Sequence, residues 1–270
     1  MRIKKYIPAN IKIALKRLLN NRRSPKFRPE YLGKQPPLYN QESINYCLCC
    51  GSLQINYTPI LWDELIRQWD LKDYEIEYIN RQQGIHCSRC KTNLRTMSIA
   101  HGMMRYEGYW GLFQNFVRTR KFRKKKILEI NKAGFLTQYL DSHRGHILAE
   151  YPEFDMQCLP YPDSSFDITL HSDTLEHIPD PIKALEECRR VLKPDGYCIF
   201  TVPIILDRLT ISRAGLPPSF HGSQQSTDTD LLVQTEFGAD AWKYVQVAGF
   251  SEVRIYSLEY PGAQSLLCKK

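Results

Sequence analysis

The stretch spanning residues 162–203 constrains the fold of this chain more than any other part of its sequence. An apolar run at residues 166–170 leads into an acidic loop that carries a histidine, and an amphipathic segment at residues 180–192 follows. A Pro-Asp-Gly turn then precedes a second apolar run at residues 197–202. This periodicity predicts strand, loop, helix, turn and strand, which together make one βαβ unit of a parallel sheet.

Length and composition are those of an ordinary globular protein. The chain has 270 residues, of which 43% are apolar and 24% charged, and this length suffices for one large domain and a small one. No apolar run approaches the roughly 18–20 residues that span a bilayer, and no signal peptide is apparent. We therefore expect a cytoplasmic protein, in which the nine cysteines are thiols or metal ligands rather than disulfides.

Positive charge is concentrated near the N-terminus. Residues 1–30 contain ten Lys or Arg and one Glu, a local charge of +9, whereas the whole chain carries +8. Residues 11–19 predict a short basic amphipathic helix, which suits peripheral contact with an anionic membrane at the inner face. The alternatives are a basic tail and a helix docked on the body. Residues 22–37 hold four prolines and predict a linker, so residues 1–37 form an N-terminal segment.

Two Cys-x-x-Cys pairs, separated by 36 residues, predict a metal site within residues 38–94. The predicted ligands are Cys47, Cys50, Cys87 and Cys90. The two-residue spacer lets both thiolates of a pair reach one zinc ion at ~2.3 Å, and four thiolates leave no open position for catalysis, so the zinc is expected to be structural. Cys49 is a spare thiol beside the site. The alternative is a set of buried free cysteines.

The rest of the chain continues the α/β pattern. A Met-rich and aromatic helix is expected at residues 95–116, and strands are expected at residues 127–130, 147–150, 252–256 and 264–268. Only four residues separate the second of these strands from the next apolar segment, which is too short for a crossover helix, so one edge of the sheet is expected to be trimmed. The basic run at residues 118–126 is interpreted as a solvated turn, with anion binding as the alternative and nucleic acid as the less favoured partner.

Three motifs within the first stretch resemble the signature of class I S-adenosylmethionine-dependent methyltransferases. They are Asp-Ser-Ser-Phe-Asp at residues 163–167, Ser-Asp-Thr-Leu-Glu-His-Ile-Pro-Asp at residues 172–180, and Arg-Val-Leu-Lys-Pro-Asp-Gly at residues 190–196. The resemblance covers residues 95–270, and the cysteine pairs extend it to a subgroup with such knuckles before the catalytic domain. It implies a doubly wound, mostly parallel, Rossmann-like seven-stranded sheet with one edge trimmed, preceded by the small zinc-binding module, and S-adenosylmethionine as cofactor.

The first cofactor motif departs from the family pattern. The family has glycines where this chain has Asn131, Ala133 and Phe135. Asn tolerates the left-handed conformation and Ala is small, whereas Phe is a larger change. Gly134 is expected to take over the close approach to the cofactor. Lys132 either pairs with the cofactor's carboxylate or is an ordinary surface lysine.

The other cofactor positions match the family more closely. Glu150 ends the second strand, where the family has an acid that accepts hydrogen bonds from the ribose hydroxyls. Asp155 and Met156 occupy the adenine position, with a plain loop pair as the alternative. Asp173 follows a strand and is expected to face the crevice. The full set of predicted cofactor-binding residues is Glu129, Asn131, Lys132, Ala133, Gly134, Glu150, Asp155, Met156 and Asp173.

Methyl transfer requires alignment of the acceptor and, for a hydroxyl, a base. His221 lies in the long insertion expected to roof the substrate and is the favoured base, with His177 and Asp173 as further catalytic candidates. We expect transfer to a hydroxyl or amine of a sugar, a surface-polysaccharide precursor or a similar small metabolite or glycan. The alternatives are an RNA methyltransferase with a zinc module and a catalytically inactive binding protein that retains the fold.

Overall fold

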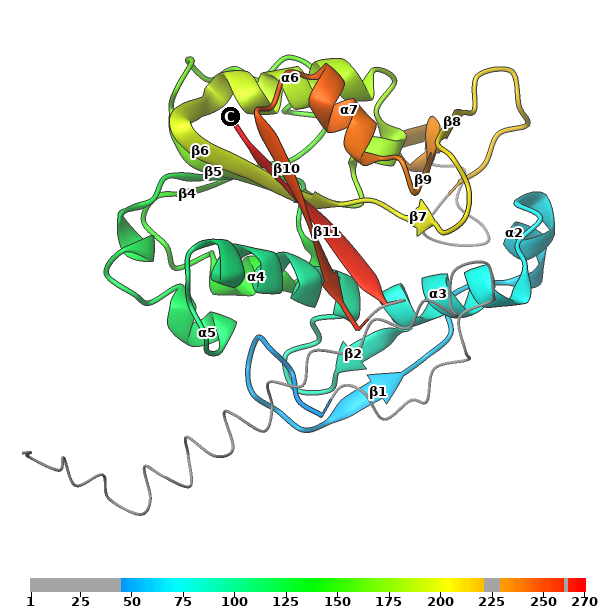
Figure 1. Ribbon diagram of the computed structural model, residues 1–270, viewed down its shortest axis with the longest axis horizontal. Coiled ribbons are helices and arrows are strands. Elements are labelled where there is room, and N and C mark those ends of the chain that lie inside the picture. The colour runs from blue at the N-terminus through cyan, green and yellow to red at the C-terminus, as the bar shows by residue number, and fades with distance from the viewer. Residues whose placement is uncertain (1–44, 221–228, 260–261) are drawn as a thin grey trace, which may run out of the picture. The chain divides into compact units, whose positions relative to one another are not determined.

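The central element of the fold is a six-stranded sheet with the strand order β10-β11-β6-β5-β3-β4 (Figure 1). The computed structural model describes residues 45–220, 229–259 and 262–270. The predicted N-terminal segment 1–37, with its membrane contact, and His221 lie outside these residues. Among the described residues no helix is long and apolar enough to cross a membrane.

Four neighbouring strands of this sheet are parallel, and the remaining two add an antiparallel edge. The parallel strands are β4 (His146–Ala149), β3 (Ile127–Ile130), β5 (Phe166–Ser172) and β6 (Leu192–Thr201). Strand β11 (Ala263–Lys269) lies antiparallel between β6 and β10 (Glu252–Leu258), and both strands occur where strands were expected. No strand forms in the described chain between β4 and β5, so the predicted trimming of one edge is confirmed.

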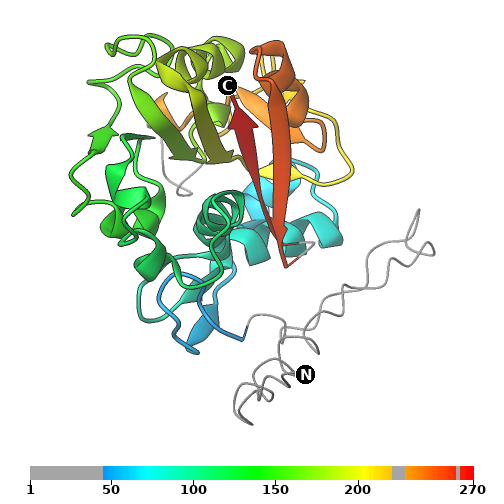
Figure 2. The same cartoon turned by 60° about the vertical axis from the view of Figure 1, so that its left-hand side comes forward.

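Both faces of the sheet are covered, which explains why the central strands read as continuous apolar runs. Alternate residues of β3 enter different cores: Ile127 belongs to the cluster that includes Met97 and Met103 of α4 (Leu94–Tyr106). Leu128 belongs to the cluster built with α6 (Pro181–Val191) and α7 (Trp242–Val247). Figure 2 shows α4 on one side of the sheet and the α6–α7 layer on the other.

The helices begin and end at residues with a clear local reason. Helix α6 starts with Asp180 as N-cap, whose side chain accepts a hydrogen bond from the Lys183 amide, and with Pro181 in the first turn. The single helix expected at residues 95–116 is instead two helices, α4 and α5 (Phe113–Phe116). Gly108 between them has a φ of 72°, which breaks the helix. After β3 a 3₁₀ helix, η3 (Gly134–Tyr139), leads toward β4.

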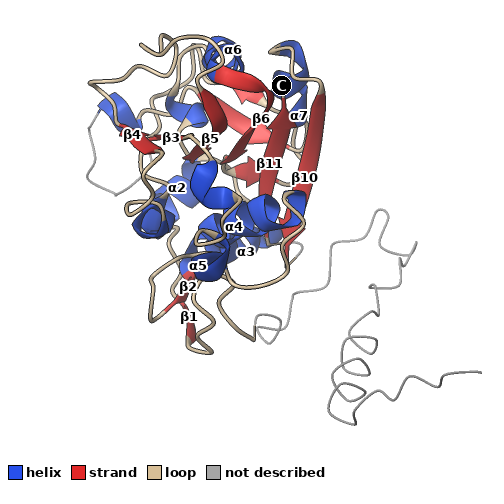
Figure 3. Ribbon diagram, turned by 90° about the vertical axis from the view of Figure 1, so that its left-hand side faces the viewer, coloured by secondary structure: helices blue, strands red, loops and turns tan. Residues whose placement is uncertain are grey.

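The cysteine-bearing segment packs directly on the methyltransferase-like core. It contains β1 (Ile55–Tyr57), α2 (Asp63–Gln68), α3 (Asp73–Gly84) and β2 (Ile85–Cys87), with β1 and β2 antiparallel. Helix α3 lies beside α4 (Figure 3). All four predicted metal ligands belong to the same buried cluster as residues of α4 and β3. The predicted boundary between residues 38–94 and 95–270 therefore falls inside a shared core.

The long insertion after β6 forms a small sheet of its own. Strands β7 (Ile204–Ile205), β9 (Thr235–Gly238) and β8 (Ile211–Ser212) occur in that order across the sheet. Short 3₁₀ turns η2 (Phe122–Lys124), η4 (Leu175–His177) and η5 (Thr229–Leu231) complete the chain. Arg208, between β7 and β8, binds the buried Glu75 carboxylate at 2.6 Å and the backbone carbonyls of Trp69 and Asp70. One arginine thus ties the insertion to α2 and α3.

Replacing Arg208 with Ala should lower the free energy of unfolding by about 2–3 kcal/mol, because the Glu75 carboxylate, which is 1% exposed, loses its charged partner. Chemical denaturation followed by circular dichroism measures this change. Arg254→Ala is the matched control, since Arg254 and Glu252 form an ion pair that is close to half exposed, and water screens such a pair so that its loss should change the stability much less. Equal losses for the two variants would contradict the proposed tie.

Candidate functional site

A cavity of about 460 Å³ opens at the carboxyl ends of the parallel strands. Lys132 follows β3, Asp173 follows β5 and Pro203 follows β6, and all three line the cavity. This is the edge at which open α/β sheets bind ligands. The opposite wall is apolar and aromatic and comes from the cysteine-bearing segment. Its residues are Ile60, Leu61, Trp62, Leu65, Trp69, Leu71 and Ile79.

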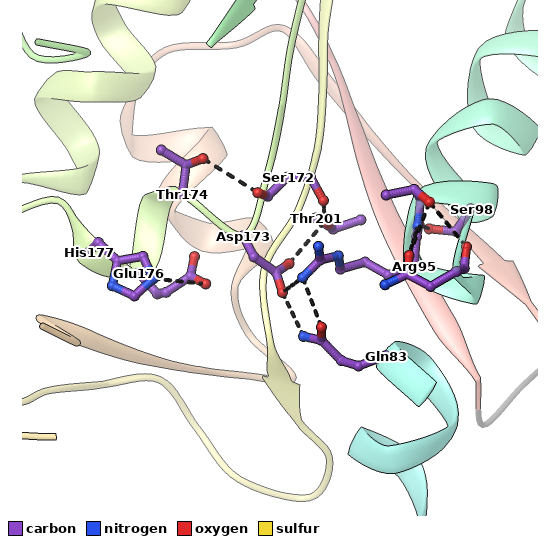
Figure 4. Close-up of polar contacts among 11 residues, drawn as sticks. Gln83, Arg95, Ser98, Ser172, Asp173, Thr174, Glu176, His177 and Thr201 are labelled. Carbon is purple, nitrogen blue, oxygen red and sulfur yellow. Dashed lines mark hydrogen bonds and ion pairs between the residues drawn. The ribbon is translucent and has the colours of Figure 1, made fainter. Parts of the chain in front are cut away.

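The carboxylate of Asp173 is the centre of the polar network at the base of this cavity (Figure 4). It accepts hydrogen bonds from Gln83 Nε2 at 2.7 Å and from Thr201 Oγ1 at 3.0 Å, and it forms an ion pair with Arg95. Its backbone φ is 46°, a left-handed conformation that Asp tolerates better than most residues. The prediction that Asp173 faces the crevice agrees with its place in the lining.

Glu176 and His177 lie beside this network in η4, and both line the cavity. Burial, together with the nearby charge of Asp173, raises the pKa of Glu176 well above its ordinary value. Burial lowers the pKa of His177. His177 Nδ1 lies 3.1 Å from the Leu232 carbonyl, which can only accept, so Nδ1 carries the proton. His177 Nε2 is then the unprotonated nitrogen, 3.6 Å from Glu176 Oε1.

The turn after β3 contains two residues in the left-handed conformation, which the family pattern assigns to glycines. Asn131 and Gly134 have φ values of 53° and 54°. The Asn131 amide donates to the Ala149 carbonyl at 2.8 Å, and its side-chain oxygen accepts from the Tyr151 amide at 2.9 Å. Asn131 therefore joins the ends of β3 and β4. Phe135 is accommodated because its side chain is 56% exposed and lies outside the core.

Glu129 supports this turn from inside the protein. Its carboxylate is fully buried and accepts hydrogen bonds from the Ala133 amide at 2.8 Å and from Thr137 Oγ1 at 2.6 Å. His146 Nε2 lies 2.7 Å from its other oxygen. Glu129, predicted as a cofactor contact, is not among the residues that line the cavity. Its contacts shape the turn on which the neighbouring predicted residues lie.

The remaining predicted cofactor residues occupy the end of β4 and the loop after it. Glu150 is partly exposed, and its Oε1 lies 3.2 Å from Lys132 Nζ. The two side chains therefore form an ion pair across the strand ends. Asp155 is exposed and accepts a hydrogen bond from the Gln157 amide. Met156 is 2% exposed and packs in the core below the α6–α7 layer.

The four predicted zinc ligands converge. All four sulfur atoms lie within 4.8 Å of one another, with Cys47–Cys90 and Cys50–Cys87 Sγ distances of 3.6 Å. A tetrahedral zinc ion with bonds of ~2.3 Å would space its sulfurs by about 3.8 Å, so the cluster could hold such an ion with little movement. In both knuckles an amide returns to the first cysteine's carbonyl: Gly51 to Cys47 at 2.8 Å and Lys91 to Cys87 at 2.9 Å.

Sequence reasoning did not single out Gln83 and Arg95, although both bind Asp173. Gln83 lies near the end of α3, and Arg95 lies in the first turn of α4. The available signal was their place on either side of the second cysteine knuckle, which was assigned to the metal module alone. Arg95 also donates to Gln83 Oε1 at 2.9 Å, so the three side chains form a closed network.

Comparison with known proteins agrees with the geometry. Residues 129–200 match the model of a family described as a methyltransferase domain. A probable S-adenosylmethionine-dependent methyltransferase of Mycolicibacterium smegmatis is 33% identical over 91 residues, covering 32% of this chain and 34% of its own length. A ubiquinone/menaquinone biosynthesis C-methyltransferase of Escherichia coli is 34% identical over 124 residues, covering 40% of this chain and 48% of its own.

A third relative is a glycine/sarcosine/dimethylglycine N-methyltransferase of Actinopolyspora halophila, 35% identical over 82 residues, with 26% of this chain and 14% of that protein covered. The chain spans less than half the length of each of these curated relatives. The matched segment contains the turn after β3, the end of β4 and Asp173 after β5, whereas the partners of Asp173, namely Gln83, Arg95 and Thr201, lie outside it.

Replacing Glu176 with Gln should change how stability depends on pH. A carboxyl whose folded pKa is raised stabilises the protein fully below its unfolded pKa of about 4.5, and this stability is lost as pH rises through the folded pKa. Gln cannot ionise, so the melting temperature of the variant should rise relative to wild type as pH increases above about 5. Arg95, Asp173 and His177 face this group and are unchanged in both proteins. Parallel melting curves across pH would contradict the buried neutral state.

Proposed function

We propose that this chain, which carries a class I S-adenosylmethionine-dependent methyltransferase domain as its sequence predicts, transfers a methyl group to a hydroxyl or amine of a sugar, a surface-polysaccharide precursor or a similar metabolite. The proposal rests on the overlap between the matched segment and the residues that line the cavity. The segment that matches the methyltransferase family also supplies two of the three strand ends that line the cavity, those of β3 and β5.

The residues at these strand ends fit the cofactor. Glu150 has an exposed carboxylate at the tip of β4, where it can accept two ribose hydroxyls on release of Lys132. Ala133 is fully buried between the left-handed Asn131 and Gly134, so the turn needs only one glycine where the family pattern has three. When bound, S-adenosylmethionine supplies a methyl group activated by the adjacent positive sulfur.

The chain's own residues would orient the acceptor and handle its proton. The apolar wall from α2 and the segment before it excludes water and can pack against the carbon face of a sugar or another ring. Asp173 and His177 lie across from it. Burial holds His177 neutral near pH 7, the state in which its unprotonated nitrogen can accept a proton from a hydroxyl. His221, the other predicted base, lies outside the described residues.

The relatives matched over this region differ in the kind of atom that they methylate. The relatives matched over this region include an enzyme named as an N-methyltransferase and one named as a C-methyltransferase. What they share with this chain is therefore the cofactor side of the site rather than a single acceptor atom. A sugar or glycan acceptor rests on the subgroup resemblance, and RNA is less favoured because the cavity lining is mainly apolar.

Replacing Glu150 with Ala should weaken S-adenosylmethionine binding by about tenfold or more, because it removes a charged acceptor of hydrogen bonds. Isothermal titration calorimetry with the cofactor measures the affinity. Glu153→Ala is the control, since Glu153 is an exposed acid of the same loop. Unchanged affinity in Glu150→Ala would show that the cofactor lies elsewhere. Absence of binding to the wild type would instead favour an inactive protein that retains the fold.

We also propose that the four-cysteine cluster holds a structural zinc ion. Cys87→Ser should lower the zinc content measured by mass spectrometry to well below one ion per chain and reduce the melting temperature, because one thiolate ligand is lost. Cys158→Ser is the control, since Cys158 is exposed and lies outside the cluster. Full zinc content with an unchanged melting temperature in Cys87→Ser would contradict the assignment.

A further inference from the structure

A second cavity, of about 590 Å³, lies apart from the site described above. Three arginines line it: Arg118 after α5, Arg123 in η2, and Arg144 in the turn before β4. We call it the arginine hollow. Among the described residues that line it there is no Asp or Glu. Three positive charges therefore line one hollow, two from residues 118–123 and one from the turn that contains Arg144.

These arginines lack the ion pairs that other arginines of the protein form. Arg190, Arg208 and Arg213 each have a carboxylate within 4 Å. Within the described ranges, no carboxylate lies that close to a guanidinium of the hollow. The lysines of the same basic run differ, because Lys121 and Lys125 both pair with Glu107. Among the described residues, two lysines of the run thus share one carboxylate, whereas Arg118 and Arg123 have no carboxylate within 4 Å.

The backbone that carries the arginines is held in place by a buried histidine. The Gly145 amide donates to His143 Nδ1 at 3.0 Å, so His143 Nε2 carries the proton and donates to the Phe122 carbonyl at 3.0 Å. The rings of His143 and Phe122 also pack edge to face, with centroids 5.4 Å apart. Arg123 follows Phe122 and Arg144 follows His143, so this contact fixes the two arginines' backbones side by side.

We propose that the arginine hollow binds a small ligand that bears phosphate groups. A guanidinium presents paired N–H donors that match phosphate oxygens, and three of them suit a diphosphate better than a single carboxylate. The volume lies in the range of small-molecule sites, so it leaves room for the organic part of a phosphate ester. Ser142 supplies a hydroxyl donor, and Val117 and Tyr139 supply a less polar wall.

Titration of the full chain with inorganic pyrophosphate, followed by calorimetry, tests the proposal. Arg144→Ala and Arg123→Ala should each weaken binding by about tenfold or more, as expected for loss of a charge-assisted hydrogen bond. Arg120→Ala is the matched control, because Arg120 is an exposed arginine of the same run that does not line the hollow. The basic residues 1–30 are the same in all variants, so they cannot cause a difference between them.

Equal affinities in all three variants, or no binding to the wild type, would overturn the proposal. Arg144→Lys separates paired hydrogen bonding from charge, and it should bind more weakly than the wild type. Two further probes identify the source of the phosphate. Uridine diphosphate represents a soluble ester, and phosphatidylcholine vesicles with and without phosphatidic acid represent a lipid headgroup. Preference for either probe, lost in Arg144→Ala, supports the phosphate site and names its source.

Discussion

The ion pair between Asp173 and Arg95 is the contact on which the arrangement of the site depends. Asp173 follows β5, Arg95 lies in the first turn of α4, and the same carboxylate binds Gln83 of α3 and Thr201 of β6. Four elements therefore meet at one side chain (Figure 4). Its partners are mostly shielded from water, and hydrogen bonds to a charged acceptor are stronger in such surroundings. The cysteine-bearing segment is positioned over the cleft by this network as well as by apolar packing.

Much of the sheet could be predicted because its signals are local. The run at β3 was expected at the residues where it occurs. Strand β5 ends later than expected, and β6 begins at Leu192, so that it includes the Pro-Asp-Gly segment that was expected to be a separate turn. Apolar residues buried on both faces leave little choice of structure. Asp173 and Glu150 could be placed because residues that follow parallel strands share one edge of the sheet. The convergence of the four cysteines could also be predicted, since a two-residue spacer lets both thiols of a pair point to one position.

The parts that could not be predicted depend on contacts between distant residues. Arg95 and Asp173 are 78 positions apart, and no local period links them. The role of Glu129 was also hidden, because its sequence position says nothing of the Thr137 hydroxyl and the His146 ring that occupy its oxygens. Gly108 ended a helix that its apolar neighbours would have continued. The first two cases depend on tertiary contacts, whereas the break at Gly108 is a local effect of the glycine itself.

The short helix η3 has a consequence for how this protein can change over evolutionary time. Its first residue, Gly134, belongs to the turn beneath the cofactor edge, and Gln138 within it donates to the Cys90 carbonyl at 2.8 Å. Six residues thus join the cysteine cluster to the opposite end of the site. A mutation that moves the Cys87–Cys90 knuckle also changes the contact that holds the turn at Gly134. The sequences of the knuckle and of the turn are therefore expected to change together. A chimeric protein that took the knuckle from one relative and the turn from another would lose the contact between them.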